Sequence, residues 1–160
     1  MFETTLYSGV TEKDYELLIK QLDALSDGET DEIAILSNAS ALLNQFLSEV
    51  NWVGFYIWKT DELVLGPFQG LPACIRIAAG IGVCGTAVEE RKTQRIADVH
   101  SFPGHIACDG ASKSEIVVPI IIDDQVYGVL DIDSPINDRF DETDQFYLEK
   151  FVAILVKHLG

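Results

Sequence analysis

The chain has 160 residues, of which 48% are hydrophobic, so it has the size of one domain and enough apolar side chains to bury a core. Acidic residues outnumber basic ones 26 to 11. The resulting formal net charge of −15 argues against nucleic acid and against anionic membrane surfaces as partners.

The N-terminus, MFETTLYSGV, lacks both the basic region and the long apolar stretch of a signal peptide. The longest apolar run, residues 116–122, is too short to cross a bilayer. The three cysteines, at positions 74, 84 and 108, do not form the framework of a secreted disulfide-rich protein. We therefore expect a soluble, cytoplasmic protein, in which any disulfide is transient and catalytic.

Two helices are predicted in the first third of the chain. Residues 11–27 have apolar side chains at helical spacing, with Thr11 as the N-cap and Asp14 three residues later. Residues 30–50 have the same spacing, with Thr30 as the N-cap and acidic residues in the first turn.

The pattern then changes to that of strands. Residues 51–58 are aromatic and β-branched, the segment TDE makes a turn, and residues 63–68 complete a hairpin. A short helix over 82–92 and a short strand over 93–99 follow.

A second hairpin consists of residues 115–122 and 125–133 on either side of a two-aspartate turn. Pro119 cannot donate a ladder hydrogen bond, so it is expected at a sheet edge or a bulge. Residues 141–160 form an amphipathic helix with an acidic first turn. This order predicts an α+β fold, with a mostly antiparallel sheet and the N- and C-terminal helices packed on one face.

One glycine motif resembles a dinucleotide-binding signature. Gly80, Gly82 and Gly85 form G-x-G-x-x-G, and Asp98 follows at about the distance of a ribose contact. A dinucleotide site needs this motif within a parallel βαβ unit, whereas the neighbours here are hairpins and the preceding strand is weak. The sequence favours a tight turn followed by close helix packing.

Soft metal ligands are available, namely Cys74, Cys84, Cys108, His100 and His105. None of their spacings matches the paired ligands of a zinc site, except that of the two histidines considered alone. We therefore expect no metal site and assign the histidines to hydrogen bonds within a loop.

The strand VYGVLDID carries two acids. Alternation places Leu130 and Ile132 on one face and Asp131 and Asp133 on the other. Two acids are costly to bury without partners, so they lie either in water on a half-exposed strand or in a functional site. The pattern alone leaves both interpretations open, and the same question applies to Glu115 on the neighbouring strand.

The strand NWVGFYIW carries the aromatic candidates. Trp52 and Tyr56 share one face with Gly54, while Val53 and Phe55 lie on the other. This face is either part of the hydrophobic core or an apolar box beside polar groups, because Trp and Tyr each combine a ring with one hydrogen-bonding group.

Five segments, in this order, resemble the free methionine-(R)-sulfoxide reductases, a GAF-domain family: GPFQGLPAC, GVCGTAV, RIADVH, FPGHIACDGASKSEIV and GVLDID. The resemblance runs from about Asn51 to the closing helix. It is specific, because generic GAF sensor domains lack the three spaced cysteines together with GHIACD and LDID. One departure is Ile81, where these relatives usually carry a basic residue, and it bears on how substrate charge is met near the site.

The resemblance implies a single GAF domain over residues 1–160, with N-terminal helices over 1–50, the sheet and site loops over 51–140, and a C-terminal helix over 141–160. It also implies a homodimer that reduces free L-methionine-(R)-sulfoxide to methionine without a cofactor, with thioredoxin as the external reductant. The alternative is a GAF sensor domain that binds a small molecule without turnover.

By motif position, the resemblance implies that Cys108 is the attacking thiol, Cys74 its disulfide partner and Cys84 a third thiol able to exchange. Such a role fits the polar Gly/Ala loop around Cys108, since a redox nucleophile needs access and freedom to reach a second thiol. Structural cysteines, by contrast, usually lie in apolar segments.

The remaining implied site residues form the pocket. Trp52 and Tyr56 would wall it, and Glu115, Asp131 and Asp133 would bind and activate the substrate. Sulfoxide reduction needs a thiolate that attacks sulfur and an acid that protonates the departing oxygen, a role that Glu115 or Asp133 can take if burial raises its pKa.

Overall fold

The computed structural model describes residues 6–105 and 108–160. Two short stretches lie outside the described residues. They are residues 1–5, which begin the segment in which no signal peptide is predicted, and residues 106–107 of the GHIACD segment. The helices are α1 (Thr11–Ser26), α2 (Glu32–Phe46), α3 (Gly82–Glu90) and α4 (Glu142–Leu159), with a short 3₁₀ helix, η1 (Val99–Ser101). The strands are β1 (Trp52–Lys59), β2 (Glu62–Gly70), β3 (Arg76–Ala78), β4 (Gln94–Ile96), β5 (Ser114–Ile122) and β6 (Gln125–Ser134).

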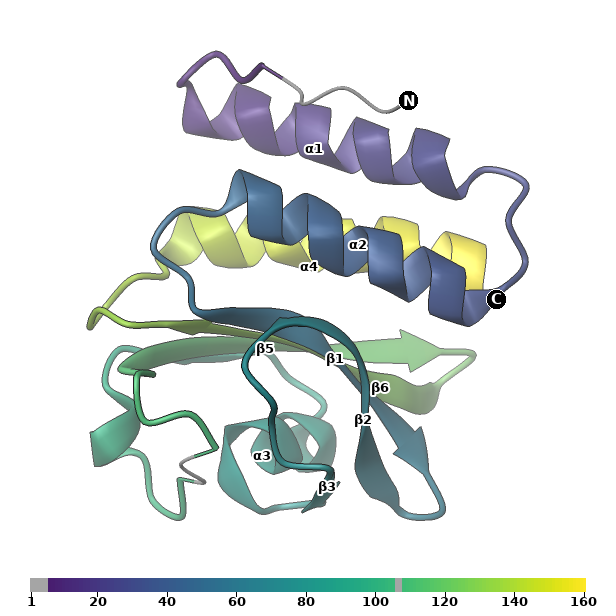
Figure 1. Cartoon of the computed structure of the whole chain (residues 1–160). Coiled ribbons are helices and arrows are strands. Elements are labelled where there is room, and N and C mark those ends of the chain that lie inside the picture. The colour runs from purple at the N-terminus through teal and green to yellow at the C-terminus, as the bar shows by residue number, and fades with distance from the viewer. Residues whose placement is uncertain (1–5, 106–107) are drawn as a thin grey trace.

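The strands form one antiparallel sheet in the order β3-β2-β1-β6-β5-β4. Helices α2 and α4 cover one face, and α1 packs on them as an outer layer (Figure 1). Helix α3 and the long loops lie on the opposite face, where α3 contacts β5 and β6. The predicted α+β fold, with its N- and C-terminal helices on one face, is therefore confirmed.

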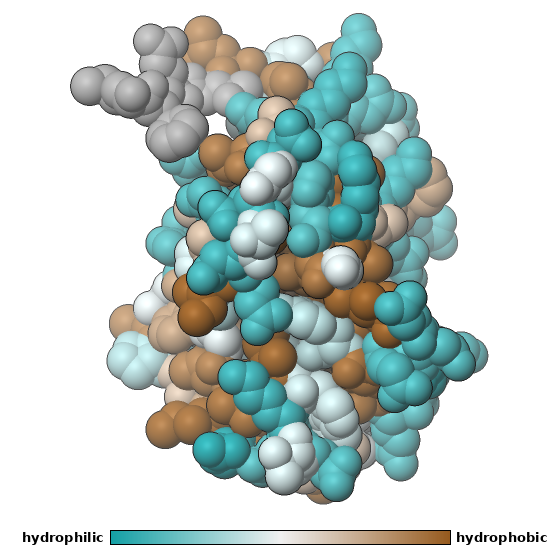
Figure 2. Space-filling model, turned by 90° about the vertical axis from the view of Figure 1, so that its right-hand side faces the viewer, coloured by the Kyte–Doolittle hydropathy of each residue, from teal (hydrophilic) through white to brown (hydrophobic). Residues whose placement is uncertain are grey.

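Each face of the sheet has its own hydrophobic cluster. Val53, Phe55, Leu130 and Ile132 belong to one cluster with buried residues of α1, α2 and α4. The alternate residues of the same strands, Trp52 among them, pack on the side of α3. Figure 2 views the right-hand side of Figure 1 and shows hydrophilic residues over much of the helical half, with hydrophobic residues between them. None of the helices in the described ranges is long and apolar enough to cross a membrane.

The first helix does not begin as predicted. Val10 occupies the N-cap position of α1 without a side-chain cap, and Thr11 is already helical, so the predicted Thr11 cap is wrong. The reason is that Asp14 instead stabilises the chain before the helix, where it accepts hydrogen bonds from the amides of Ser8 at 2.8 Å and Gly9 at 2.9 Å.

The predicted Thr30 cap of the second helix is also wrong. Asp31 is the N-cap of α2 and accepts from the amides of Ile33 and Ala34. A carboxylate at this position satisfies two free N–H groups and also interacts favourably with the helix dipole. Helix α2 ends at Phe46, four residues before the predicted end, and Glu49 takes a positive φ of 56° as the chain turns toward β1.

Both predicted hairpins are confirmed. Thr60 and Asp61 in the first turn, and Asp123 and Asp124 in the second, have the same pair of positive φ values, 51° and 64°, which is typical of two-residue type I′ turns.

Strand β4 pairs with β5 only from Glu115 to Val117, so Pro119 lies beyond the end of β4. The register with β6 shifts just after it, between residues 120 and 121. Both parts of the expectation for Pro119 are therefore met.

The glycine motif is a turn, as predicted. Gly80 and Gly82 have positive φ values of 78° and 67°, and the Gly80 amide donates to the Gly85 carbonyl at 2.8 Å. A Cβ at Gly85 would collide with the carbonyl oxygen of Ala78, so this glycine allows α3 to pack closely on β3. Every strand pair in the described part of the sheet is antiparallel, so the motif has no βαβ context.

Candidate active site

Three carboxyl groups lie together on the α3 side of the sheet. Glu115 of β5 lies opposite Asp133 of β6, and Asp131 is two residues along β6 on the same face. Glu115 and Asp131 are each only 6% exposed, and Asp133 is half-buried. The interpretation of these acids as solvated residues on a half-exposed strand is therefore wrong, because α3 and the loops cover this face.

Burial decides the ionisation of the three carboxyls. It raises the pKa of Glu115 well above its ordinary value, and the charges of the two neighbouring aspartates raise it further. Burial and the charge of Asp131 do the same to the pKa of Asp133. Burial also raises the pKa of Asp131, but hydrogen bonds to Glu115, Cys84 and Asp133 oppose this rise. Asp131 therefore ionises more readily than its neighbours, and the environment of Glu115 and Asp133 favours their protonated forms.

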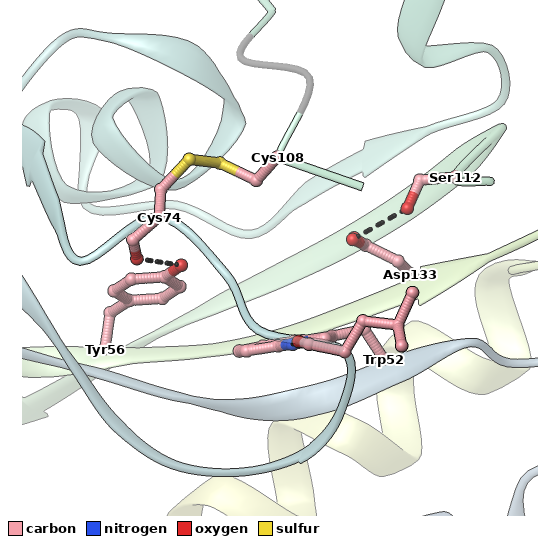
Figure 3. The surroundings of a disulfide bond; sticks show 7 residues. Trp52, Tyr56, Cys74, Cys108, Ser112 and Asp133 are labelled. Atoms are coloured by element: carbon pink, nitrogen blue, oxygen red, sulfur yellow. Dashed lines mark hydrogen bonds between the residues drawn. A yellow bond between two sulfur atoms is a disulfide. The ribbon is translucent and has the colours of Figure 1, made fainter. Parts of the chain in front are cut away.

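The three cysteines are placed differently. Cys74, from the loop between β2 and β3, and Cys108, from the loop between η1 and β5, are joined by a disulfide with a Cα–Cα distance of 5.6 Å (Figure 3). Both are half-buried. The pairing that the resemblance implied is thus present. Cys84 on α3 is a free thiol, 5% exposed, and burial together with the charge of Asp131 raises its pKa.

The two predicted aromatic residues line the site and hold one of its loops. Trp52 and Tyr56 stack with a centroid separation of 5.9 Å. The Trp52 Nε1 donates to the carbonyl of Leu71 at 3.1 Å, and the Tyr56 hydroxyl donates to the carbonyl of Cys74 at 2.8 Å (Figure 3). Their polar groups therefore fix the loop that carries Cys74, and their rings wall the cavity next to it.

A hydrogen-bonded network that sequence reasoning missed ties the Cys108 loop to the carboxyls. Asn51 Nδ2 donates to Asp109 Oδ2 at 2.9 Å and to Ser112 Oγ at 3.1 Å. Ser112 Oγ in turn donates to Asp133 Oδ2 at 3.0 Å (Figure 3). Two features of the sequence could have indicated this network: the polar run DGAS after Cys108 and the asparagine directly before Trp52.

The backbone amides of the two histidines donate hydrogen bonds within the loop. His100 donates to Asp98 at 3.0 Å and His105 to the carbonyl of Phe102 at 3.2 Å. The ring of His105 lines the site, and its buried Nδ1 has no hydrogen-bond partner among the described residues. Burial and the neighbouring His100 lower its pKa, which favours a neutral ring.

These residues enclose a small cavity of about 40 Å³. Its lining comprises Trp52, Tyr56, Pro72, Ala73, Ile77, Ile81, Gly82, Val83, Cys84, His105, Cys108, Asp109, Ser112, Glu115, Asp131 and Asp133. A cavity of this volume has room for ordered water beside the carboxyls. Ile81 lies at its rim with 51% of its surface exposed.

The arrangement can support thiol redox chemistry with acid assistance. The disulfide borders the cavity, which is also lined by carboxyls whose raised pKa favours the protonated form. A thiol freed from the disulfide therefore shares this cavity with groups that can protonate a departing oxygen.

Comparison with known proteins places this site in a family. A GAF-domain family profile matches residues 29–156. The free methionine-R-sulfoxide reductase of Escherichia coli is 54% identical over 146 residues, which cover 91% of this chain and 88% of that protein. The structure of fRMsr of Staphylococcus aureus in its reduced form is 58% identical with a TM-score of 0.90, covering 99% of this chain and 100% of that chain.

A further structure, that of free methionine-R-sulfoxide reductase from Neisseria meningitidis in complex with its substrate, is 42% identical with a TM-score of 0.95. It covers 99% of this chain and 96% of that chain. The chain therefore belongs to the GAF-domain family and, within it, to the free methionine-(R)-sulfoxide reductases, which are oxidoreductases.

Proposed function

We propose that this protein reduces free L-methionine-(R)-sulfoxide to L-methionine. The observation that carries the proposal is the Cys74–Cys108 disulfide at the edge of a cavity lined by three carboxyls. An acidic, aromatic-walled pocket suits a ligand with an ammonium group and an apolar methylthio end, and it disfavours an anion.

The proposed reaction begins with Cys108. Its thiolate attacks the sulfoxide sulfur, the oxygen is transferred to Cys108 as a sulfenic acid, and methionine leaves as the thioether. Glu115 or Asp133 supplies the proton that the oxygen needs, since the raised pKa of each favours its protonated form. The Cys74 thiol then condenses with the sulfenic acid, which forms the disulfide and releases water.

The other pocket residues bind the substrate. Asp131, the most readily ionised of the three carboxyls, attracts the ammonium group. Trp52 and Tyr56 hold the methyl end, so the sulfur is positioned for attack. Cys84 is buried behind these groups with a raised pKa, which suits a third thiol that exchanges later and not the first nucleophile.

The disulfide must be reduced again after each turnover, and we assign this step to thioredoxin without a bound cofactor. Leu71, Ile75 and Ile81 next to the disulfide are 63%, 66% and 51% exposed, so they offer an apolar contact surface on an otherwise acidic protein. The need for a dithiol reductant supports the cytoplasm as the compartment. We also propose a homodimer, which would cover part of the exposed apolar surface, such as that of Phe146 on α4.

The activity is tested directly with substrate analogues. We expect methionine release from the free R sulfoxide with dithiothreitol as reductant, and little from the S epimer. Acetylation of the α-amino group removes the cation that the carboxyls bind, so kcat/KM should fall by about 10²-fold or more. Equal rates on the N-acetylated sulfoxide would contradict the assigned specificity, and no turnover of any sulfoxide would favour the sensor alternative.

The roles of the thiols are tested by single turnover of the reduced protein. Cys108→Ser should release no methionine, because a hydroxyl is too weak a nucleophile. Cys74→Ser should release one methionine per subunit and then stop as a sulfenic acid, which a dimedone-type probe traps at Cys108. Cys84→Ser should keep this first turnover. Methionine release from Cys108→Ser together with none from Cys84→Ser would assign the nucleophile's role to Cys84.

The reductant surface is tested by comparing two reductants. Ile75→Glu should raise the KM for thioredoxin about tenfold, the equivalent of about 1.4 kcal/mol of contact, and leave the rate with dithiothreitol unchanged. Ile33→Glu on α2 is the matched control, since Ile33 is also 66% exposed but lies on the opposite side of the sheet. An unchanged thioredoxin KM in Ile75→Glu would rule out this contact.

A further inference from the structure

Cys84, Glu115 and Asp131 form a compact group of potential metal ligands. The Cys84 sulfur and one carboxylate oxygen from each acid all lie within 4.8 Å of one another. The three side chains come from α3, β5 and β6, and they are 5%, 6% and 6% exposed. The described structure includes all three cysteines of the chain, and Cys84 is the one left free by the disulfide.

A second observation is that one oxygen of this group has no partner. Asp131 hydrogen-bonds with Glu115, Cys84 and Asp133, but its Oδ1 is buried and has no hydrogen-bond partner among the described residues, and Asp131 lines the cavity. The same holds for Asp133 Oδ1 beside it. A buried acceptor without a partner costs free energy, typically about 1–3 kcal/mol. A cation in the cavity would interact favourably with these oxygens.

The chemistry of the ligands selects the kind of cation. A cavity of about 40 Å³ has room for a metal ion together with a water ligand. Calcium and magnesium prefer sites made entirely of oxygen, whereas zinc binds a thiolate sulfur together with carboxylate oxygens and imidazole nitrogens in four-coordinate sites. Cys84, Glu115 and Asp131 supply three such ligands. His105 lines the same cavity but does not belong to this group, so the fourth position is left to water.

We propose that the cavity binds a thiophilic divalent cation of the zinc type through Cys84, Glu115 and Asp131, and that this ion excludes the substrate. The exclusion of substrate rests on the proposed function, because Asp131 and Glu115 are the groups assigned to the sulfoxide substrate. The binding of the ion itself does not depend on that function. The ion displaces the thiol proton of Cys84 and the carboxyl proton of Glu115, so that both become anionic ligands and both protons are released to solvent. Zinc would thus be a reversible inhibitor that occupies the enzyme when substrate is scarce.

The oxidised protein allows a direct test. With Cys74 and Cys108 joined, any cadmium–thiolate charge-transfer absorbance must come from Cys84. Titration of the oxidised protein with Cd²⁺ should produce this absorbance with saturation at one ion per chain, and Zn²⁺ should reverse it. The absence of thiolate absorbance in the oxidised wild type would overturn the proposal.

Variants identify the ligands. Cys84→Ser should abolish the absorbance, and Asp131→Asn should weaken Cd²⁺ affinity by about tenfold or more. Asp133→Asn is the matched control, because it changes a neighbouring carboxyl of the same cavity that is not one of the three ligands. The loss of Cd²⁺ affinity in Asp133→Asn should therefore be smaller than in Asp131→Asn. Glu16→Gln, on the exposed side of α1, should have no effect. Absorbance that persists in Cys84→Ser, or equal losses from both aspartate variants, would contradict the assigned ligands.

Folding and substrate competition are measured separately. Circular dichroism of Cys84→Ser, with Cys84→Ala as the second variant, establishes that the loss of binding occurs in folded protein. In the Cys74→Ser/Cys108→Ser protein, which cannot turn over, methionine-(R)-sulfoxide should displace Cd²⁺. Cadmium binding without displacement would overturn the exclusion of substrate but not the metal site. Failure of the proposed reduction, by contrast, would appear in metal-free wild-type assays.

Discussion

Burial of three carboxyl groups on one face of the β5–β6 hairpin is the constraint on which the rest of the site depends. The raised pKa values of Glu115 and Asp133 mean that the folded state binds more protons than the unfolded chain. Their contribution to stability is therefore complete below the ordinary carboxyl pKa, about 4, and is lost as pH rises through the raised values. The opposite face of the same strands compensates, because Leu130 and Ile132 are fully buried against the helices.

The same burial links the chemistry of the site to its specificity. Protonated carboxyls next to a reducible disulfide supply acid to a departing oxygen, and the remaining negative charge favours a cationic group over an anion. Burial also separates the thiols, since Cys108 is half-buried on a loop whereas Cys84 lies beneath the carboxyls with a raised pKa. Cys84 is thus poorly placed as a first nucleophile but well placed as a metal ligand, so one set of residues accounts for both proposals.

Local sequence patterns predicted the strands and the face on which each candidate side chain lies. Alternation placed Trp52 with Tyr56, and Asp131 with Asp133, because the period of a strand is set by its backbone. The same alternation left the burial of the acids open, since that depends on α3 and on loops far away in sequence. The network through Ser112 was missed for a similar reason: Asn51 Nδ2 meets Ser112 Oγ at 3.1 Å across a separation of 61 residues. The Thr30 cap was wrong because Asp31, one residue later, is a better N-cap that also carries a charge.

The central claim is that Glu115 carries a proton at neutral pH in the substrate-free protein. Infrared difference spectroscopy of Cys108→Ser against Cys108→Ser/Glu115→Gln measures this directly, because a protonated carboxyl has a C=O stretch that is separate from the carboxylate bands. We expect the difference spectrum at neutral pH to contain the band of a protonated carboxyl, which weakens only when the pH is raised well above the ordinary range for glutamate. A difference spectrum with carboxylate bands alone at neutral pH would contradict the account.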